Sequence, residues 1–179
     1  IRIEWWLNEY FIFSDASFDP KSKRGITAFL ILSASQWKKN AEDCNFDIQT
    51  KQIDGENIAR LEFISAITAF EEWKIHFQTV ETSVQITLIT DCKALENLLK
   101  RRKRLERTQF ISQSKGEVLA NADLYQEFLT LFDELQPEIL WVKGHSPAKN
   151  RSDFQKVFSS VDKAARNLLR KSWVSEIHL

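Results

Sequence analysis

Short apolar runs in the first third of the chain are typical of β-strands. They lie at 10–13, which leads into the polar segment Ser14–Ser17, and at 25–32, and a half-exposed alternating run follows at 46–53. Apolar runs of this length, bounded by polar and turn-forming residues, indicate strands. Because the connections between them are short, we expect the three strands to pair antiparallel.

The apolar pattern then changes to the period of an α-helix. A helix is predicted over 57–77, with Ile58, Leu61, Ile64, Ile67, Phe70 and Trp73 along one face. This spacing is that of an amphipathic helix. A fourth strand is predicted over 84–89 and ends at Thr90–Asp91, and a second helix begins at Lys93.

The C-terminal part continues the alternation of helix and strand. We predict an amphipathic helix over 121–135, stopped by Pro137, then a fifth strand over 139–142. A last helix has Val161, Ala165, Leu168, Leu169 and Trp173 on its apolar face. The order predicts an α/β fold, with a mixed five-stranded sheet (three antiparallel strands, then two parallel) flanked by helices on both faces. With 179 residues, the chain is long enough to bury a core as a single domain over 1–179.

The charges of the chain balance but are unevenly distributed. The 25 Lys and Arg residues offset 25 Asp and Glu residues, which by itself argues mildly against nucleic-acid binding. One dense basic stretch nevertheless runs from Lys100 to Arg104 and on to Arg107, with Lys115 beyond it. Such a run is usually a solvated helix face, so its role depends on what surrounds it.

Cysteine content and hydropathy favour an intracellular protein. Cys44 and Cys92 are too few for a disulfide framework and have no CxxC spacing, so we expect a reducing, cytoplasmic setting. No apolar run approaches the roughly 20 residues that span a bilayer. Glu4 and Glu9 make the first ten residues unlike a signal peptide. We therefore expect no membrane association, and we expect a monomer.

Four carboxylates stand where a mixed sheet gathers ligands. Asp15 lies near the end of the first strand and Asp91 directly follows the fourth, and ligands of such sheets bind beyond the carboxyl ends of strands. Glu62 interrupts the apolar stretch of the first helix, and Asp162 opens the last one. Taken singly, each has a structural alternative. Asp91 is a good N-cap, Asp162 suits a first helical turn, and Glu62 suits a solvated helix surface.

Six segments, in the same order, resemble those of the type 1 ribonucleases H. They are Phe11–Ser17 (FIFSDAS), Arg60–Ala66 (RLEFISA), Leu88–Cys92 (LITDC), Asn121–Tyr125 (NADLY), Val142–His145 (VKGH) and Asp162–Arg166 (DKAAR). The VKGH segment is similar to the fifth-strand motif of that family residue for residue. The likeness extends over most of the chain, and it implies the ribonuclease H-like fold.

The resemblance implies that Asp15, Glu62, Asp91 and Asp162 converge, bind metal and act in catalysis. Like charges that close raise one another's pKa, and a hard divalent cation relieves the repulsion. Mg²⁺ prefers oxygen ligands, and two such ions about 4 Å apart would activate a water and stabilise the leaving oxygen. Oxygen ligands accept Mn²⁺ as a substitute. His145 stands where the family has a histidine assisting proton transfer or product departure, although a surface histidine is the alternative.

The implied activity is Mg²⁺-dependent endonuclease cleavage of the RNA strand of an RNA–DNA hybrid, leaving 3′-hydroxyl and 5′-phosphate ends. A basic insertion around 100–120 and residues near the carboxylates are expected to contact the hybrid. In full, these expected contacts are Ala16, Ser17, Asn57, Arg60, Lys100, Arg101, Arg102, Arg104, Lys115 and Asn121. Two departures from the family pattern stand out. Ala16 replaces a glycine, and no tryptophan lies between Lys100 and Asn121.

The fourth carboxylate has a rival in Asp153. The spacing from His145 to Asp162 is long, so we interpret 146–160 as a loop insertion in which Phe154–Ser160 precede the last helix. We prefer Asp162 because the rest of the DKAAR segment follows it on a well-formed helix.

Two other classes of protein fit part of the pattern. Another nuclease of the ribonuclease H superfamily (a transposase or integrase core, a junction resolvase or an exonuclease) would share the acidic residues, but it would lack the VKGH strand and the basic insertion. A non-catalytic hybrid-binding domain would keep four carboxylates facing phosphates, which is electrostatically unfavourable. Cleavage of a hybrid, tested with and without Mg²⁺, distinguishes these alternatives.

Overall fold

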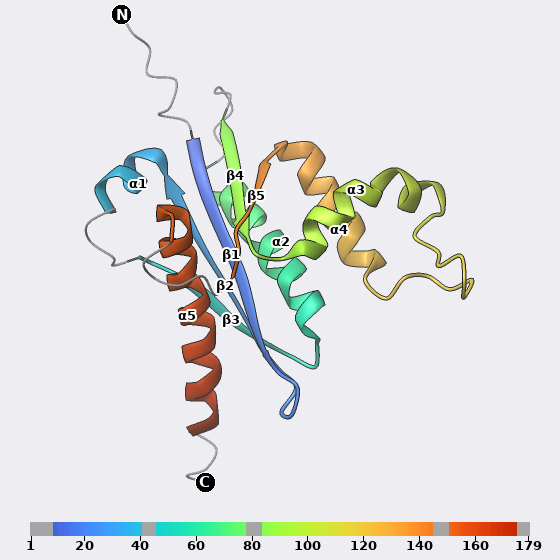
Figure 1. Ribbon diagram of the computed structural model, residues 1–179, viewed down its shortest axis with the longest axis horizontal. Coiled ribbons are helices and arrows are strands. Elements are labelled where there is room, and N and C mark those ends of the chain that lie inside the picture. The colour runs from blue at the N-terminus through green and yellow to red at the C-terminus, as the bar shows by residue number, and fades with distance from the viewer. Residues whose placement is uncertain (1–8, 41–45, 78–83, 145–150, 175–179) are drawn as a thin grey trace, which may run out of the picture.

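Five strands form a single mixed sheet in the computed structural model, which describes residues 9–40, 46–77, 84–144 and 151–174. The strands are β1 (Glu9–Asp19), β2 (Arg24–Ser33), β3 (Gln49–Asp54), β4 (Gln85–Thr90) and β5 (Glu138–Trp141). Their order across the sheet is β3-β2-β1-β4-β5 (Figure 1). The pairs β1–β2 and β2–β3 are antiparallel, whereas β1–β4 and β4–β5 are parallel. The predicted five-stranded mixed sheet is confirmed.

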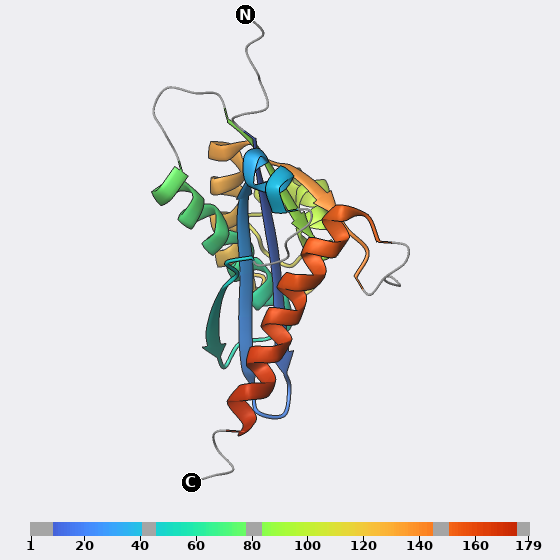
Figure 2. The ribbon, with the colours of Figure 1, turned by 90° about the vertical axis from the view of Figure 1, so that its left-hand side faces the viewer.

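Helices cover both faces of the sheet. They are α1 (Ala34–Asn40), α2 (Ile58–Phe77), α3 (Lys93–Arg107), α4 (Ala122–Leu135) and α5 (Asp153–Val174). Figures 1 and 2 show α1 and α5 on one face and α2, α3 and α4 on the other. In the described residues, no helix combines the length and apolar character needed to cross a membrane.

Each face of the sheet has its own apolar core, and β1 contributes to both. Ile12 packs into the core formed with α2, α3 and α4, whereas Phe11 and Phe13 pack into the core formed with α1 and α5. Successive side chains of a strand point to opposite faces, so a continuous apolar run is expected for a central strand covered on both sides.

The first turns of α2 are held tightly against β2. A methyl group on Gly25 would contact Leu61 and would lie 2.6 Å from the carbonyl oxygen of Ile53. The Ser65 hydroxyl, which is fully buried, donates a hydrogen bond to the carbonyl oxygen of Ala28 at 3.0 Å. Glu62 lies between these two contacts, so its backbone position on the sheet is fixed.

The last helix begins earlier than the sequence pattern indicated. It is helical from Asp153, so the interpretation of Phe154–Ser160 as part of a loop insertion is wrong, and Asp162 lies inside the helix instead of opening it. Ser152 and Gln155 form a reciprocal cap. The Ser152 amide donates to Gln155 Oε1 at 2.9 Å, and the Gln155 amide donates to Ser152 Oγ at 3.3 Å. Such a capping box fixes the start of a helix.

Two shorter elements also differ from the prediction. The seven-residue helix α1 was not predicted, and helices this short are marginal by themselves. Trp37 on α1 stacks on Phe154, with ring centroids 4.6 Å apart, and on Phe13 at 6.0 Å, so tertiary contacts hold the helix. The third strand begins at Gln49, three residues later than expected.

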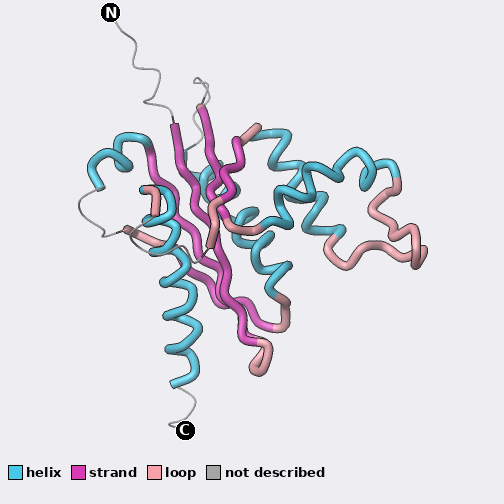
Figure 3. The backbone as a smooth tube through the Cα atoms, in the orientation of Figure 1, coloured by secondary structure: helices cyan, strands magenta, loops and turns pink. Residues whose placement is uncertain are grey.

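The basic stretch lies within α3 itself. Figure 3 shows the loop of residues 108–121, which follows α3 and extends away from the sheet before α4 begins. Lys100 to Arg107 are helical, and Lys115 is exposed in the loop. We refer to α3 as the basic helix. The predicted basic insertion is therefore helical over 100–107 and a loop over 108–120.

Candidate active site

One pocket of about 400 Å³ contains all four predicted carboxylates. Asp15 comes from β1, Glu62 from α2 and Asp162 from α5, and Asp91 directly follows β4. The four side chains are far apart in the sequence and belong to both helical layers and the sheet between them. The predicted convergence of these residues is what the structure shows. Their catalytic and metal-binding roles stay predictions.

The pairing of β1 with β4 explains why two of the aspartates are neighbours. Phe13 lies opposite Ile89 in this parallel pair. Asp15 lies two residues after Phe13 in β1, and Asp91 lies two residues after Ile89, directly beyond the end of β4. In extended chain, residues two apart lie on the same side of the pleat. Neighbouring strands lie about 4.8 Å apart, so the register brings the two carboxylates to the same place.

Asp15 occupies an electrostatically unfavourable position in the pocket. Its side chain is buried, with 8% of the residue exposed. Burial, followed by the nearby charges of Asp91 and Asp162 and to a smaller extent of Glu62, raises the pKa of Asp15 to about 8. A carboxyl group in this setting stays protonated near neutral pH unless a cation joins the site.

Glu62 has a partner that the sequence pattern did not reveal, the thiol of Cys92. Burial raises the pKa of Glu62, a hydrogen bond from the Cys92 thiol lowers it, and Asp91 raises it. Cys92 is buried, and burial together with the negative charge of Glu62 raises the pKa of the thiol. The thiol therefore stays protonated and acts as a hydrogen-bond donor. Its position directly after Asp91 was the only available signal.

The last residue of β5 and the segment after it lie against Asp91 and Thr90. The Trp141 indole donates a hydrogen bond to the carbonyl oxygen of Asp91 at 2.9 Å, and the Val142 amide donates to that of Thr90, also at 2.9 Å. A methyl group on Gly144 would lie 2.5 Å from Asp91 Oδ2. Any side chain at position 144 would therefore displace the Asp91 carboxylate.

The structure favours Asp162 over Asp153 as the fourth carboxylate of the pocket. Asp162 lines the pocket and forms an ion pair with Arg166, one turn further along α5. The side chain of Asp153 is 72% exposed, pairs with Lys156 at 2.8 Å and does not line the pocket. Val161 next to Asp162 is fully buried, so the helix presents Asp162 from a fixed position.

Three cationic residues also line the pocket and were not among the predicted site residues. They are Lys143, Arg151 and Arg166. Arg151 donates a hydrogen bond to the Ser159 hydroxyl at 2.8 Å. Cations beside the carboxylates suit a ligand that is itself an anion, such as a phosphate. Lys143 and Arg166 belong to the VKGH and DKAAR segments, and this was the signal available for them.

The donor set suits Mg²⁺, which prefers oxygen ligands. Within the described part of the chain, however, no three Asp, Glu, His or Cys side chains stand close enough together to hold a metal ion as they lie. Glu62 is engaged by Cys92, and Asp162 by Arg166. Coordination of one cation by three of these carboxylates therefore requires at least one of them to turn toward the others.

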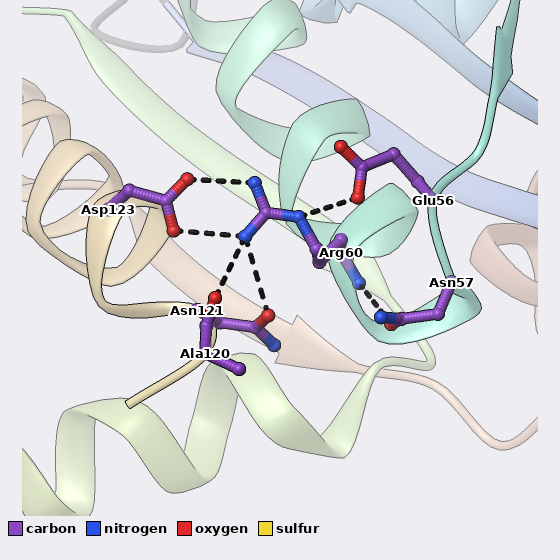
Figure 4. Close-up of polar contacts among 6 residues, drawn as sticks. All are labelled: Glu56, Asn57, Arg60, Ala120, Asn121 and Asp123. Atoms are coloured by element: carbon purple, nitrogen blue, oxygen red, sulfur yellow. Dashed lines mark hydrogen bonds and ion pairs between the residues drawn. The ribbon is translucent and has the colours of Figure 1, made fainter. Parts of the chain in front are cut away.

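The predicted nucleic-acid contacts fall into three groups. Ala16 and Ser17 line the pocket. Asn57, Arg60 and Asn121 lie together at the start of α2 and of α4 (Figure 4). The remaining predicted residues, Lys100, Arg101, Arg102, Arg104 and Lys115, lie on the basic helix and the loop after it. His145 lies outside the described residues.

Arg60 is already occupied by protein groups. Its guanidinium donates to both carboxylate oxygens of Asp123, at 2.9 and 2.7 Å, and to Glu56 at 2.7 Å. It also reaches the carbonyl oxygen of Ala120 at 3.1 Å (Figure 4). The sequence identified a functional arginine candidate here, and the structure shows an arginine that ties α2 to α4.

Several solved structures have a similar fold. LC9-RNase H1, described as a type 1 RNase H with the type 2 active-site motif, matches with a TM-score of 0.62 and 16% identity, over 89% of this chain and 73% of that chain. A foamy viral protease-reverse transcriptase in complex with RNA/DNA hybrid matches with a TM-score of 0.59 and 8% identity, over 92% of this chain and 20% of that chain. The foamy viral protein in complex with dsDNA matches with a TM-score of 0.56 and 8% identity, over 85% of this chain and 91% of that chain. At these identities the likeness shows the fold.

A mixed sheet in this strand order, covered on both faces and carrying an acidic pocket beside β1 and β4, defines an α/β protein with the ribonuclease H-like fold. The family model for RNase H matches residues 8–168. The chain belongs to the RNase H family, as the six sequence segments indicated. Membership implies a ribonuclease, which is a hydrolase. No curated protein matches the chain.

Proposed function

We propose that the protein is a Mg²⁺-dependent endonuclease that hydrolyses the RNA strand of RNA–DNA hybrids and leaves 3′-hydroxyl and 5′-phosphate ends. The observation that carries this proposal is the pocket in which Asp15 is buried beside three other carboxylates. Four like charges destabilise one another, so their presence at one place is best explained by a cation that they bind in common.

Asp15, Glu62, Asp91 and Asp162 would hold the metal. Bound Mg²⁺, as two ions in this proposal and with Mn²⁺ as a substitute, would supply positive charge at the phosphate and activate a water. The protein contributes orientation. β1 and β4 fix Asp15 and Asp91 from the sheet, while Glu62 and Asp162 approach from helices on its two faces. His145 is proposed to assist proton transfer or product departure.

The hybrid is the proposed substrate because of the family and of the surface around the pocket. One structural neighbour was solved in complex with an RNA/DNA hybrid, which supports the choice. Ala16 and Ser17 at the pocket are proposed to contact the strand that is cut, and Asn57 and Asn121 to contact the hybrid nearby. Exposed cations of the basic helix and Lys115 are proposed to bind its phosphates.

The test is cleavage of a labelled RNA–DNA hybrid compared with duplex DNA, duplex RNA and both single strands, with Mg²⁺ and with a chelator. We expect cleavage of the RNA strand of the hybrid alone, only with Mg²⁺, and products with 3′-hydroxyl ends. Asp91→Asn serves as the inactive control. Equal cleavage of duplex DNA would instead support another nuclease of the superfamily, and binding without cleavage would support a hybrid-binding domain.

We also propose that the protein acts as a monomer in a reducing, cytoplasmic setting. Cys92 is a free, buried thiol beside Glu62, and its oxidation would remove the donor to that carboxylate. Sedimentation of the purified protein tests the monomer, and fractionation of cells that express the full protein tests the location.

A further inference from the structure

Two arginine–aspartate pairs fasten the two ends of α4 to neighbouring helices. Near its start, Asp123 receives two hydrogen bonds from Arg60 of α2, at 2.9 and 2.7 Å (Figure 4). In its last turn, Asp133 receives two from Arg102 of the basic helix, at 2.5 and 2.6 Å. Planar, bidentate pairs of this kind are the geometrically specific form of ion pair.

Arg102 differs from every other cation in the basic stretch by the direction of its side chain. It lies four residues after Leu98 and three before Leu105, both of which are buried, and residues at these spacings share one helix face. Its side chain is only 28% exposed. In contrast, the neighbouring cations on the helix are all exposed, namely Lys100, Arg101, Lys103, Arg104 and Arg107. Arg102 therefore faces the protein, and the others face solvent.

All three guanidinium nitrogens of Arg102 already donate hydrogen bonds to carboxylates of the protein. Its Nε donates to Glu106 at 2.6 Å, in addition to the two bonds to Asp133. The hydrogen bonds to Asp133 and Glu106 raise the pKa of Arg102, and the bonds from Arg102 lower the pKa of Asp133. A phosphate contact by Arg102 would have to replace carboxylates that already satisfy the guanidinium.

The contacts made by α4 lead directly to the carboxylate pocket. Phe128 of α4 packs edge-on against Phe63 of α2, with ring centroids 5.8 Å apart, and both side chains are fully buried. Phe63 is the residue next to Glu62. The basic helix is thus connected to the helix that carries Glu62 through Asp133, α4 and a close-packed aromatic contact. Because close-packed interiors are hardly compressible, a displacement of α4 is transmitted to α2.

We propose that Arg102 is a positioning residue, which through Asp133 sets the distance between the exposed cations of the basic helix and the carboxylate pocket. This inference rests on the proposed function, because the distance matters only if one hybrid contacts both places. The phosphates are bound by the exposed cations, and the place of the cut relative to those phosphates is set by the Arg102–Asp133 pair. Arg102 is therefore removed from the predicted hybrid contacts.

The variant Asp133→Asn distinguishes a positioning role of Arg102 from a phosphate-binding role, because the two roles predict opposite changes in hybrid affinity. If Arg102 were a phosphate ligand restrained by Asp133, this change would release a cation and remove an acidic charge. Hybrid binding would then tighten, and the log–log salt slope would steepen by about 0.9 per added contact. A positioning role predicts the reverse. We expect binding to weaken about threefold to tenfold, the salt slope to stay constant and the cut positions to spread along a hybrid of defined length.

Exchange of the two charges provides the rescue. The pair Arg102→Asp with Asp133→Arg keeps the net charge and restores a bidentate arginine–aspartate pair, with the arginine now on α4. We expect it to restore the affinity and the narrow cut pattern lost in Asp133→Asn. The matched control Arg104→Ala should lower the salt slope without spreading the cuts. Tighter binding by Asp133→Asn, or no recovery by the folded exchange pair, would overturn the proposal.

Two precautions make the outcome unambiguous. If the exchange pair fails to fold, as shown by circular dichroism, the sign of the affinity change in Asp133→Asn decides alone. Hybrid binding, measured by fluorescence anisotropy, does not depend on cleavage. Failure of the unmodified protein to cut a hybrid would therefore refute the proposed function, while the affinity measurements still decide the role of Arg102.

Discussion

The carboxylate pocket and the basic helix place their charges in opposite ways. In the pocket, Asp15 is buried beside other acids, and its pKa is raised to about 8 because that environment opposes its negative charge. On the basic helix, most cations are exposed, and the half-buried Arg102 has a carboxylate partner on another helix. A chain with no net charge can thus hold one strongly acidic and one strongly basic region.

The difference shows which charges serve the fold and which require something from outside. Arg60 and Arg102 each form an ion pair with an aspartate on a neighbouring helix, so their charges contribute to the packing of the helices. A charge that is buried beside like charges is unfavourable until a cation arrives. Removal of a charge that is paired within the protein should change how the helices are positioned. Removal of a charge that is buried beside like charges should change the rate of cleavage.

The largest effect is expected from Asp91→Asn. The variant should lower the rate of hybrid cleavage by several orders of magnitude, because it removes a charge from the pocket, while the fold stays intact. Thermal unfolding without metal should show an equal or higher midpoint, since repulsion within the pocket decreases. A variant that retains near-normal turnover in Mg²⁺ would contradict the role of the pocket.

Asp162→Asn and Asp153→Asn form a matched pair on the same helix. The first should lower the single-turnover rate at saturating hybrid by orders of magnitude, because Asp162 lines the pocket. The second should change the rate by less than about tenfold, which is under about 1.4 kcal/mol of barrier, because Asp153 is exposed and paired with Lys156. The reverse order of effects would place the fourth carboxylate at Asp153.

The protonation of Asp15 should make the stability of the metal-free protein depend on pH. A raised pKa means that the folded protein holds a proton that the unfolded chain releases. Its stabilising contribution is therefore present at low pH and is lost as pH rises from near 3.8 through about 8. Asp15→Asn should remove this decline and gain roughly 1–3 kcal/mol at pH 8. Urea unfolding in a chelator measures this pH dependence. Identical pH profiles for the two proteins would show that the pKa of Asp15 is not raised in the folded protein.

The smallest effect on chemistry is expected from the exposed cations. Arg101→Ala combined with Arg104→Ala should weaken hybrid binding and reduce the log–log salt slope by about 0.9 for each lost phosphate contact, with little change in the single-turnover rate. Arg170→Ala combined with Lys171→Ala on α5 is the control with the same charge change. If both pairs behave alike, the basic helix is only a solvated surface.

The contrast between the two regions also explains what the sequence could predict. The strands and the long helices follow from apolar periodicity, which is a local signal. The position of Asp91 directly after β4 follows from the same signal, whereas Asp15 lies inside β1, which continues to Asp19. The convergence of the four carboxylates was implied by the resemblance to the type 1 ribonucleases H. The pairs formed by Arg60 and Arg102 depend on which helices pack together, and a charge pattern contains no such information.

The structure also differs from the sequence prediction at the start of α5 and at α1, and the two differences have different causes. The early start of α5 was encoded locally, in the Ser152–Gln155 capping box, and the long spacing after the VKGH segment led to its interpretation as a loop. Helix α1 is too short to be stable alone and depends on Trp37 stacking on Phe154 of α5. Local capping can be read from a sequence, whereas a stacking partner more than a hundred residues away cannot.

If the four carboxylates form a Mg²⁺-dependent site for hybrid cleavage, the cleavage rate depends on Mg²⁺ through them, and a Mg²⁺ titration of that rate measures the dependence. Initial rates on one labelled hybrid are compared for the unmodified protein and for Glu62→Gln, which keeps the shape of the side chain. We predict no cleavage in chelator, a saturable rise with Mg²⁺ for the unmodified protein, and loss of that rise in the variant. Cleavage that is independent of Mg²⁺, or an unchanged titration curve in Glu62→Gln, would contradict this dependence.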